Sequence, residues 1–165
     1  MLAILVSLAA PSFRTVMANS RVSGLTNELS AALNLARSEA VKRGRTVTVC
    51  KSSNTAATVT TTAPGCDTAT AATWPDGWAI FVDQATRGQR DGSNDTLIRV
   101  GQPATRNGIQ TGSTFAGAVS FFPNGSSSAS GTATNDTLTL CVAPAQRQIL
   151  ISRTGQIQIL KGTCT

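Results

Sequence analysis

The amino-acid sequence predicts an α+β fold, in which a long N-terminal helix with an apolar first half packs against one or more antiparallel β-sheets. Two patterns along the chain indicate this class. Up to Gly44, apolar residues recur at steps of three and four, as on one face of an α-helix. From Arg45 onward the period is two, as in strands with one buried face. A helix followed by a run of strands is typical of a sheet that covers the helix on one side.

The predicted helix is amphipathic over residues 21–44. Its apolar face is formed by Val22, Leu25, Leu29, Ala32 or Leu33, Ala36 and Ala40. Gly44 is the predicted C-cap, because glycine readily takes the left-handed conformation that ends many helices. Lys42 and Arg43 precede it, and their positive charges suit the negative end of the helix dipole.

The chain opens with an apolar run from Met1 to about Phe13. A membrane-spanning helix needs roughly 20 apolar residues, so this run alone is too short. It has no basic flank and passes directly into the amphipathic helix, which argues against a signal peptide. We therefore expect residues 1–20 to be the second part of a longer, truncated apolar helix. The alternative is a buried core helix with a kink or a start at Pro11.

Alternating apolar residues predict a β-domain over residues 45–165. The predicted strands are residues 45–50, 78–82, 97–100, 118–122 and 137–141, followed by a hairpin of residues 148–152 and 156–160. Gly155 supplies the positive φ angle of that hairpin. A further short strand around Ile109 is left open. The segments between the strands are predicted as a surface loop or poor hairpin (51–73), a tight turn (74–77) and a flexible polar loop (126–135).

Four cysteines form an even set, which allows three pairings. In an exported chain they predict two disulfides. The favoured pairing joins Cys50 to Cys66, closing a Thr- and Ala-rich loop, and Cys141 to Cys164, fastening the last strands to the C-terminus. Closing the first loop stabilises the fold by about 3 kcal/mol in the chain-entropy model. The alternative is four free thiols in a cytosolic protein, but Cys164 lies where a chain frays unless it is tied down.

The chain is basic, with a formal net charge of +6, although only 13% of its residues are charged. A basic surface favours anionic partners such as nucleic acid or acidic lipid headgroups. The candidate DNA contacts form one group at the helix end and one near the C-terminal hairpin: Lys42, Arg43 and Arg45, and Arg147, Arg153 and Lys161. The sequence does not determine whether the two groups share a face, and ordinary surface charge is the simpler interpretation.

No enzyme, cofactor or metal site is predicted. The chain has no histidine, so the usual Ser-His-Asp and Cys-His arrangements cannot form. It also has no C-x-x-C, which argues against zinc. Asp83, Asp91 and Asp95 occupy one loop and have the oxygen ligands that Ca²⁺ prefers. Their spacing differs from that of an EF-hand and two arginines lie between them, so a solvated turn is the expectation.

Several segments carry a resemblance that runs in order over nearly the whole chain. They are residues 2–13, 34–44 with the strand that ends at Cys50, 76–83, 97–99, 121–125, 138–141 and 151–155. Together they resemble the GspH/FimT/FimU group of type IV minor pilins and pseudopilins. The resemblance implies a type IV pilin-like fold, with residues 1–20 in the inner membrane as a single-pass segment and later in the fibre core. Residues 21–165 would form the globular head.

The resemblance also implies a function. It is that of a FimU- or GspH-like minor pilin of a Gram-negative bacterium, which joins other minor and major pilins through its helix at pilus initiation or at the tip. The fibre would lie at the cell surface or in the periplasm. The prepilin cleavage motif is absent, so processing and methylation are implied by the resemblance alone.

Two alternatives remain within the same group. One is a pseudopilin of a type II secretion system. The other is a FimT-like pilin that binds DNA during natural transformation. Pilins of the FimT type resemble one another in a Gly-Arg-x-Arg motif near the C-terminus. This chain has Gly155-Gln-Ile-Gln158 there, and the glutamines Gln156 and Gln158 weaken the DNA-binding interpretation.

Overall fold

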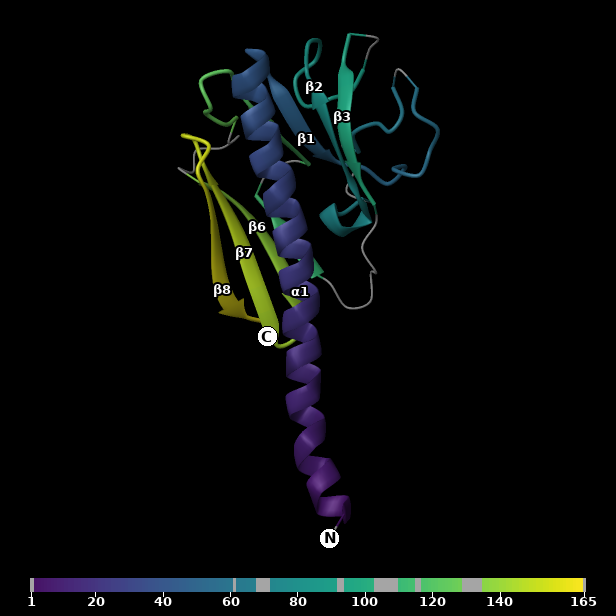
Figure 1. The fold of residues 1–165 in the computed structure, drawn as a ribbon, viewed down its shortest axis with the longest axis vertical. Helices are drawn as coiled ribbons and strands as arrows, with labels where there is room; N and C mark the ends of the chain where they lie inside the picture. The colour runs from purple at the N-terminus through teal and green to yellow at the C-terminus, as the bar shows by residue number, and fades with distance from the viewer. Residues whose placement is uncertain are drawn as a thin grey trace.

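The structure, a computed structural model, describes residues 2–60, 62–67, 72–91, 94–102, 110–114, 117–128 and 135–164, and for residues 2–12, 110, 111 and 135 it describes the backbone alone. Its longest element is helix α1, Leu2–Arg43. This helix runs along the whole molecule, and its N-terminal part extends beyond the β-sheets (Figure 1). The predicted α+β architecture is confirmed.

The buried face of α1 is the one that the spacing predicted. Val22, Ala36 and Ala40 are fully buried, and Leu29 is only 1% exposed. Gly44 ends the helix with a φ of 63°, a left-handed conformation that glycine takes without steric strain, so the predicted C-cap is also confirmed.

Two four-stranded antiparallel sheets pack against α1. The first has the order β3-β2-β1-β5 and the second the order β4-β6-β7-β8. Their bounds are β1 Val47–Lys51, β2 Trp78–Val82, β3 Thr96–Gly101, β4 Gln110–Ser113, β5 Ala118–Phe121, β6 Asn135–Val142, β7 Ala145–Ser152 and β8 Ile157–Thr163. Figure 1 shows β1 to β3 on one side of α1 and β6 to β8 on the other.

The predicted strands are present, with corrections at their ends. β1 begins at Val47 rather than Arg45, because the N–H of Arg45 still bonds to the carbonyl of Ala40 at 3.3 Å. The predicted turn at residues 74–77 is a short 3-10 helix, η1 Trp74–Asp76. Ile109 lies outside the described residues, and β4 begins at the next position, Gln110. Residues 129–134 of the predicted flexible loop also lie outside them.

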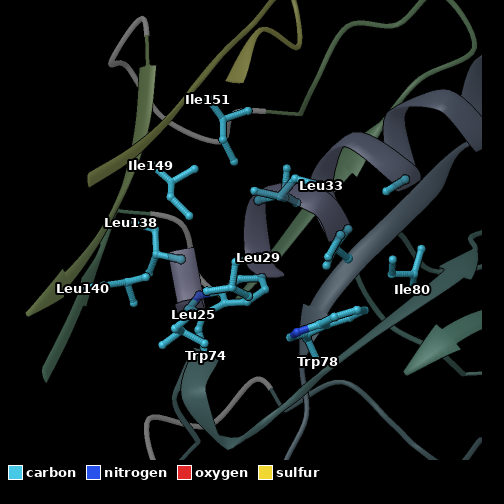
Figure 2. Close-up of a cluster of buried hydrophobic side chains, with 14 of the residues drawn as sticks. Leu25, Leu29, Leu33, Trp74, Trp78, Ile80, Leu138, Leu140, Ile149 and Ile151 are labelled. Carbon is cyan, nitrogen blue, oxygen red and sulfur yellow. The ribbon is translucent and has the colours of Figure 1, made fainter. Parts of the chain in front are cut away.

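The main core lies where α1 meets both sheets (Figure 2). Leu25, Leu29 and Leu33 project from α1, while Trp78 and Ile149 approach from the first and the second sheet. All five side chains are at most 6% exposed. Fully burying a leucine contributes about 1.5–3 kcal/mol. The helix is therefore the element through which the two sheets share one core.

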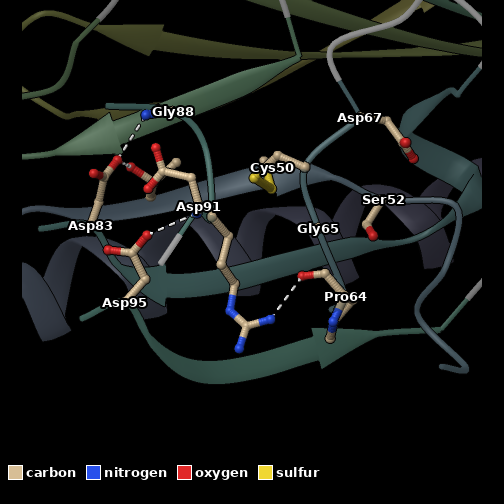
Figure 3. The surroundings of a disulfide bond; sticks show 12 residues. Cys50, Ser52, Pro64, Gly65, Asp67, Asp83, Gly88, Asp91 and Asp95 are labelled. Atoms are coloured by element: carbon tan, nitrogen blue, oxygen red, sulfur yellow. Dashed lines mark hydrogen bonds between the residues drawn. A yellow bond between two sulfur atoms is a disulfide. The ribbon is translucent and has the colours of Figure 1, made fainter. Parts of the chain in front are cut away.

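The two disulfides join the pairs that the sequence favoured. Cys50 bonds to Cys66 with their Cα atoms 5.5 Å apart, and Cys141 bonds to Cys164 with their Cα atoms 5.9 Å apart. Cys50 belongs to a second, smaller apolar cluster on the face of the first sheet opposite α1, together with Phe81. Its disulfide therefore holds the polar loop across the outer face of that sheet (Figure 3).

Candidate functional site

The surface of α1 divides into an end that carries exposed apolar side chains and a part that the head covers. Phe13 and Val16 are 67% and 61% exposed, and Met17 is 41% exposed. Ala18, one residue later, is buried at 5%. Large apolar side chains that stand together on a surface mark a site of contact with another protein or a membrane. The apolar surface therefore begins at the edge of the head and continues away from it.

Arg37 fixes the C-terminal half of α1 to two turns of the head. Its Nε donates a hydrogen bond to the carbonyl oxygen of Gly125 at 3.0 Å. Its Nη2 donates to the carbonyl oxygen of Thr154 at 3.2 Å. Gly125 follows β5, and Thr154 lies in the turn between β7 and β8. One guanidinium thus connects the helix to both sheets.

The contact between these two turns requires a glycine at position 155. Gly155 has a φ of 75°, and a Cβ atom added to it would lie 2.1 Å from the carbonyl oxygen of Gly125 and 3.0 Å from Nε of Arg37. The two turns therefore touch through their backbones, with no room for a side chain. Three of the segments that carry the family resemblance, around Arg37, Gly125 and Gly155, meet here and hold the head at one position on the helix.

The sequence did not reveal the contact of Arg37. Arg37 lies off the apolar face that the spacing predicted, and its hydrogen bonds reach partners more than 80 positions away. The available signal was the two turn glycines, each of which follows a strand. That signal indicated turns but did not indicate that the turns meet.

An open groove runs beside this contact, between α1 and the turn after β5. Its volume is about 530 Å³. Its lining is formed by Asn34, Arg37, Ser38, Val41, Lys42, Asn124 and Gly125. Val41 is 54% exposed and lies beside the cationic Lys42. The lining has cations, amides, one hydroxyl and one aliphatic side chain, which suits contact with a protein surface, and the hydroxyl of Ser38 donates to the carbonyl of Leu35 rather than to a base.

The basic residues at the end of the helix are exposed and make local contacts. Nε of Arg43 donates to Glu39 at 2.5 Å, and this hydrogen bond is the main cause that lowers the pKa of the Glu39 carboxyl. Nζ of Lys42 lies 4.0 Å from the same carboxylate. Nη1 of Arg45 donates to Gln84 at 2.5 Å. Arg153 precedes Thr154, so it lies near Arg37 at this same end of the head.

The other predicted basic residues lie elsewhere. Nη2 of Arg147 donates to Oδ1 of Asn19 at 3.2 Å and to the hydroxyl of Ser23 at 3.3 Å, so its guanidinium is used to hold α1. Lys161 is directly opposite Arg147 on β8. At the helical rise of ~1.5 Å per residue, Asn19 and Lys42 are about 35 Å apart along α1. The six candidate DNA contacts are therefore divided between two ends of the head.

The aspartate loop is buried, so the expectation of a solvated turn is wrong for two of its three carboxylates. Asp83 is 8% exposed and Asp95 is 5% exposed. Asp83 accepts hydrogen bonds from the hydroxyl of Thr48 at 2.7 Å and the N–H of Gly88 at 2.8 Å. Asp95 accepts from the N–H of Asp91 at 3.2 Å (Figure 3). Across the described ranges, no three His, Cys, Asp or Glu side chains are grouped to hold a metal ion.

Asp83 should give the stability of the protein a pH dependence. Burial is the main cause that raises its pKa above the ordinary 3.8, its hydrogen bonds with Thr48 and Gly88 oppose the rise, and the charges of Asp95 and Asp91 add to it. The folded state therefore binds this proton more tightly than the unfolded state, and stability falls as pH rises from the ordinary value through the raised one.

The expected result is that Asp83→Asn lessens this fall. The measurement is the free energy of unfolding in urea at a series of pH values from about 4 to 7. Asp91→Asn, which changes an exposed member of the same loop and removes only the smallest of the causes that raise the pKa of Asp83, is the control and should keep most of the slope. An unchanged slope in the Asp83 variant would exclude this carboxyl as its source.

These features define a class of protein. A long helix with an apolar exposed end, held by two antiparallel sheets, is a type IV pilin-like α+β fold. A model of the family described as "Type II transport protein GspH" matches residues 25–155. The chain belongs to this GspH family of minor pilins and pseudopilins, and as a member it is a structural, non-enzymatic protein.

Solved structures agree on the fold. A crystal structure of the Pseudomonas aeruginosa type IV minor pilin FimU superposes with a TM-score of 0.62 at 20% identity, covering 88% of this chain and 94% of that one. A second crystal form of FimU gives 0.59 at 21% identity, covering 87% and 97%. The minor pseudopilin EpsH of the Vibrio cholerae type 2 secretion system gives 0.52 at 15% identity, covering 86% and 97%. A search of curated proteins found no match.

The length and apolar character of the N-terminal helix decide whether it could cross a membrane within the described residues. Over the part of the chain that the structure describes, no helix is both long and apolar enough to cross a membrane.

Proposed function

We propose that this chain is a minor pilin that takes part in type IV pilus assembly, as a subunit that initiates the fibre or lies at its tip. The observation that carries the proposal is the exposed apolar surface of α1, which begins at Phe13, Val16 and Met17 immediately beyond the head. Family membership supports a role in a pilin-type assembly.

The apolar end of the helix must be kept out of water both before assembly and in the fibre. Before assembly the inner membrane covers it: residues 1–20 form the proposed membrane part, of which Ala18 and Asn19 already lie against the head, and residues 21–165 form the head outside. In the fibre, the same surface packs against the helices of other minor and major pilins, so it stays out of water. The contact of Arg37 with Gly125 and Thr154 fixes the head to the helix, so that helix packing also places the head.

Deletion of the gene tests this proposal in the bacterium that carries it. We expect the number of surface pili and twitching motility to fall steeply, and the full-length gene to restore both. A variant in which Phe13 and Val16 are replaced by aspartate should fail to restore them, because a charge in an apolar helix contact costs several kcal/mol. Unchanged piliation after deletion would contradict the proposal.

The alternative within the family is a pseudopilin of a type II secretion system. Its α1 would pack in the same way, in a shorter fibre. The deletion phenotype distinguishes the minor pilin from the pseudopilin: deletion of a pseudopilin stops export of secreted enzymes and leaves surface pili in place.

A DNA-binding pilin is the second candidate, and one observation favours it: Lys42, Arg43 and Arg153 lie at the same end of the head. The test is titration of the protein with short duplex DNA at low and moderate salt. Any binding should weaken with salt and with neutralisation of these three residues. Arg147→Gln should leave it unchanged, because that guanidinium bonds to α1. No binding even at low salt would leave the charge as ordinary surface.

A further inference from the structure

The free edge of β8 differs from the other strand edges of the molecule. β4 and β5 have only four residues each, and β5 is also covered, because the N–H of Ser128 bonds to the carbonyl of Ser120 at 2.7 Å. The pairing of β2 with β3 shifts register between Ile80 and Phe81. Short strands, covered edges, bulges and charged side chains, above all lysine, are the usual protections of an edge.

Of these protections β8 has only the charge of Lys161. Its seven residues pair with β7 in one unbroken register, from Ile157 opposite Ile151 to Thr163 opposite Ala145. Residues 158–163 are all exposed. Among the described residues, no backbone pairs with its outer side. A long and uncovered edge is a template for pairing with another chain, and Lys161 restricts that pairing to a partner of complementary charge.

The hydrogen-bond pattern identifies which groups this edge offers. The N–H of Ser152 bonds to the carbonyl of Gln156 at 3.0 Å, so even-numbered residues of β8 direct their backbone groups to β7. The N–H and C=O groups of Ile159 and Lys161 therefore point outward. A partner strand would find two regularly spaced donor and acceptor pairs there.

The side chains at this edge select the chemistry of the partner. Ile159 is 44% exposed, and next on the same face is Lys161, opposite Arg147 on β7. The sequence has no acidic residue after Asp136. Opposite charges that face one another across strands attract, and like charges repel. The edge therefore favours an extended segment with an apolar residue beside Ile159 and an aspartate or glutamate beside Lys161.

The position of the edge indicates which molecule brings that segment. Arg147 bonds to Asn19 and Ser23, which places Lys161 at the level of α1 where the exposed apolar surface of Val16 and Met17 begins. A subunit that packs its helix on that surface also reaches β8. A second copy of this chain is a poorer fit. Antiparallel pairing of two β8 strands around Leu160 would place the two Lys161 side chains diagonally across the new strand pair, where their like charges repel.

We propose that the free edge of β8 pairs with an extended, acidic segment of a neighbouring pilin-type subunit whose helix packs against α1. The pairing rests on the proposed function and adds to it the surface that orients the head. Backbone hydrogen bonds along Ile159 and Lys161 supply attachment, and the acidic side chain beside Lys161 supplies selectivity.

The test is cross-linking of the full chain in the assembling bacterium. A photo-reactive amino acid at Gln158 should form a covalent product with another pilin-type subunit, identified by mass spectrometry. The same group at Val59, which is 61% exposed in the loop that the Cys50–Cys66 disulfide closes beside the first sheet, is the control and should give no such product. A product with a second copy of this chain, or none with any pilin subunit, would overturn the proposal.

Four substitutions at three positions separate the contribution of the backbone hydrogen bonds from that of the charge. Ile159→Pro removes an outward N–H and should lower the product about tenfold while the head stays folded. Leu160→Pro removes an N–H directed to β7 and should unfold the hairpin. Lys161→Glu should lower the product about tenfold, and Lys161→Arg should keep it. Full cross-linking in both the Ile159→Pro and Lys161→Glu variants would exclude edge pairing.

The outcomes separate the two proposals. If gene deletion abolishes the fibres but no cross-link forms from Gln158, the assembly role stands and the β8 edge is not its contact. If deletion leaves the fibres intact, the proposed function fails and the pairing falls with it.

Discussion

Replacing Gly155 by alanine should destabilise the protein by about 2–4 kcal/mol, a combination of left-handed backbone strain and overpacking. The new Cβ would lie 2.1 Å from the carbonyl oxygen of Gly125, a backbone atom that cannot move without displacing the turn after β5. It would also reach Arg37, whose two hydrogen bonds connect α1 to both turns. Urea unfolding of the purified protein measures the change.

Gly24→Ala is the matched control for this substitution. Gly24 lies in α1, and a Cβ atom added there meets nothing within 4 Å. Alanine has the higher helix propensity, so this variant should be more stable by about 0.5–1 kcal/mol. Equal effects at the two positions would mean that the close approach of Gly155 to Gly125 is not a constraint on the fold.

The elements that follow a simple period could be predicted from the sequence. Leu29 and Ala36 are buried because a face of α1 repeats every three or four residues, and Trp78–Val82 is a strand with the predicted bounds. The cysteine pairing also followed from local reasoning, since each favoured pair joins the ends of one segment. These features depend on residues that are near one another along the chain.

The arrangement of the site depends on contacts between distant segments, and no period encodes them. Nothing in the sequence marks the partners of Arg37, because they are backbone carbonyls, which any residue type supplies. The burial of Asp83 was missed for a related reason: its hydrogen bonds come from Thr48, on a strand 35 positions away, and from a loop N–H. Arg147 looked like a free surface cation, and only the tertiary fold brings it to α1.

Replacing Leu29 by alanine should destabilise the protein by about 2–5 kcal/mol, the usual cost of a cavity left by a buried leucine. Leu29 is 1% exposed and belongs, like Trp74, to the core cluster that α1 forms with both sheets (Figure 2). Val41→Ala is the control on the same helix. Val41 is 54% exposed, so its truncation should change the free energy of unfolding by less than about 0.5 kcal/mol.

The Leu29 variant also tests whether α1 makes the head one cooperative unit. The protein has two tryptophans, Trp74 and Trp78, and both are buried in the shared core, so their fluorescence reports on it. Because the two sheets meet through α1, fluorescence and far-UV circular dichroism should change at the same urea concentration, shifted equally in the variant. Two separate transitions would mean that each sheet is stable without the helix, and that α1 could then move relative to the head during assembly.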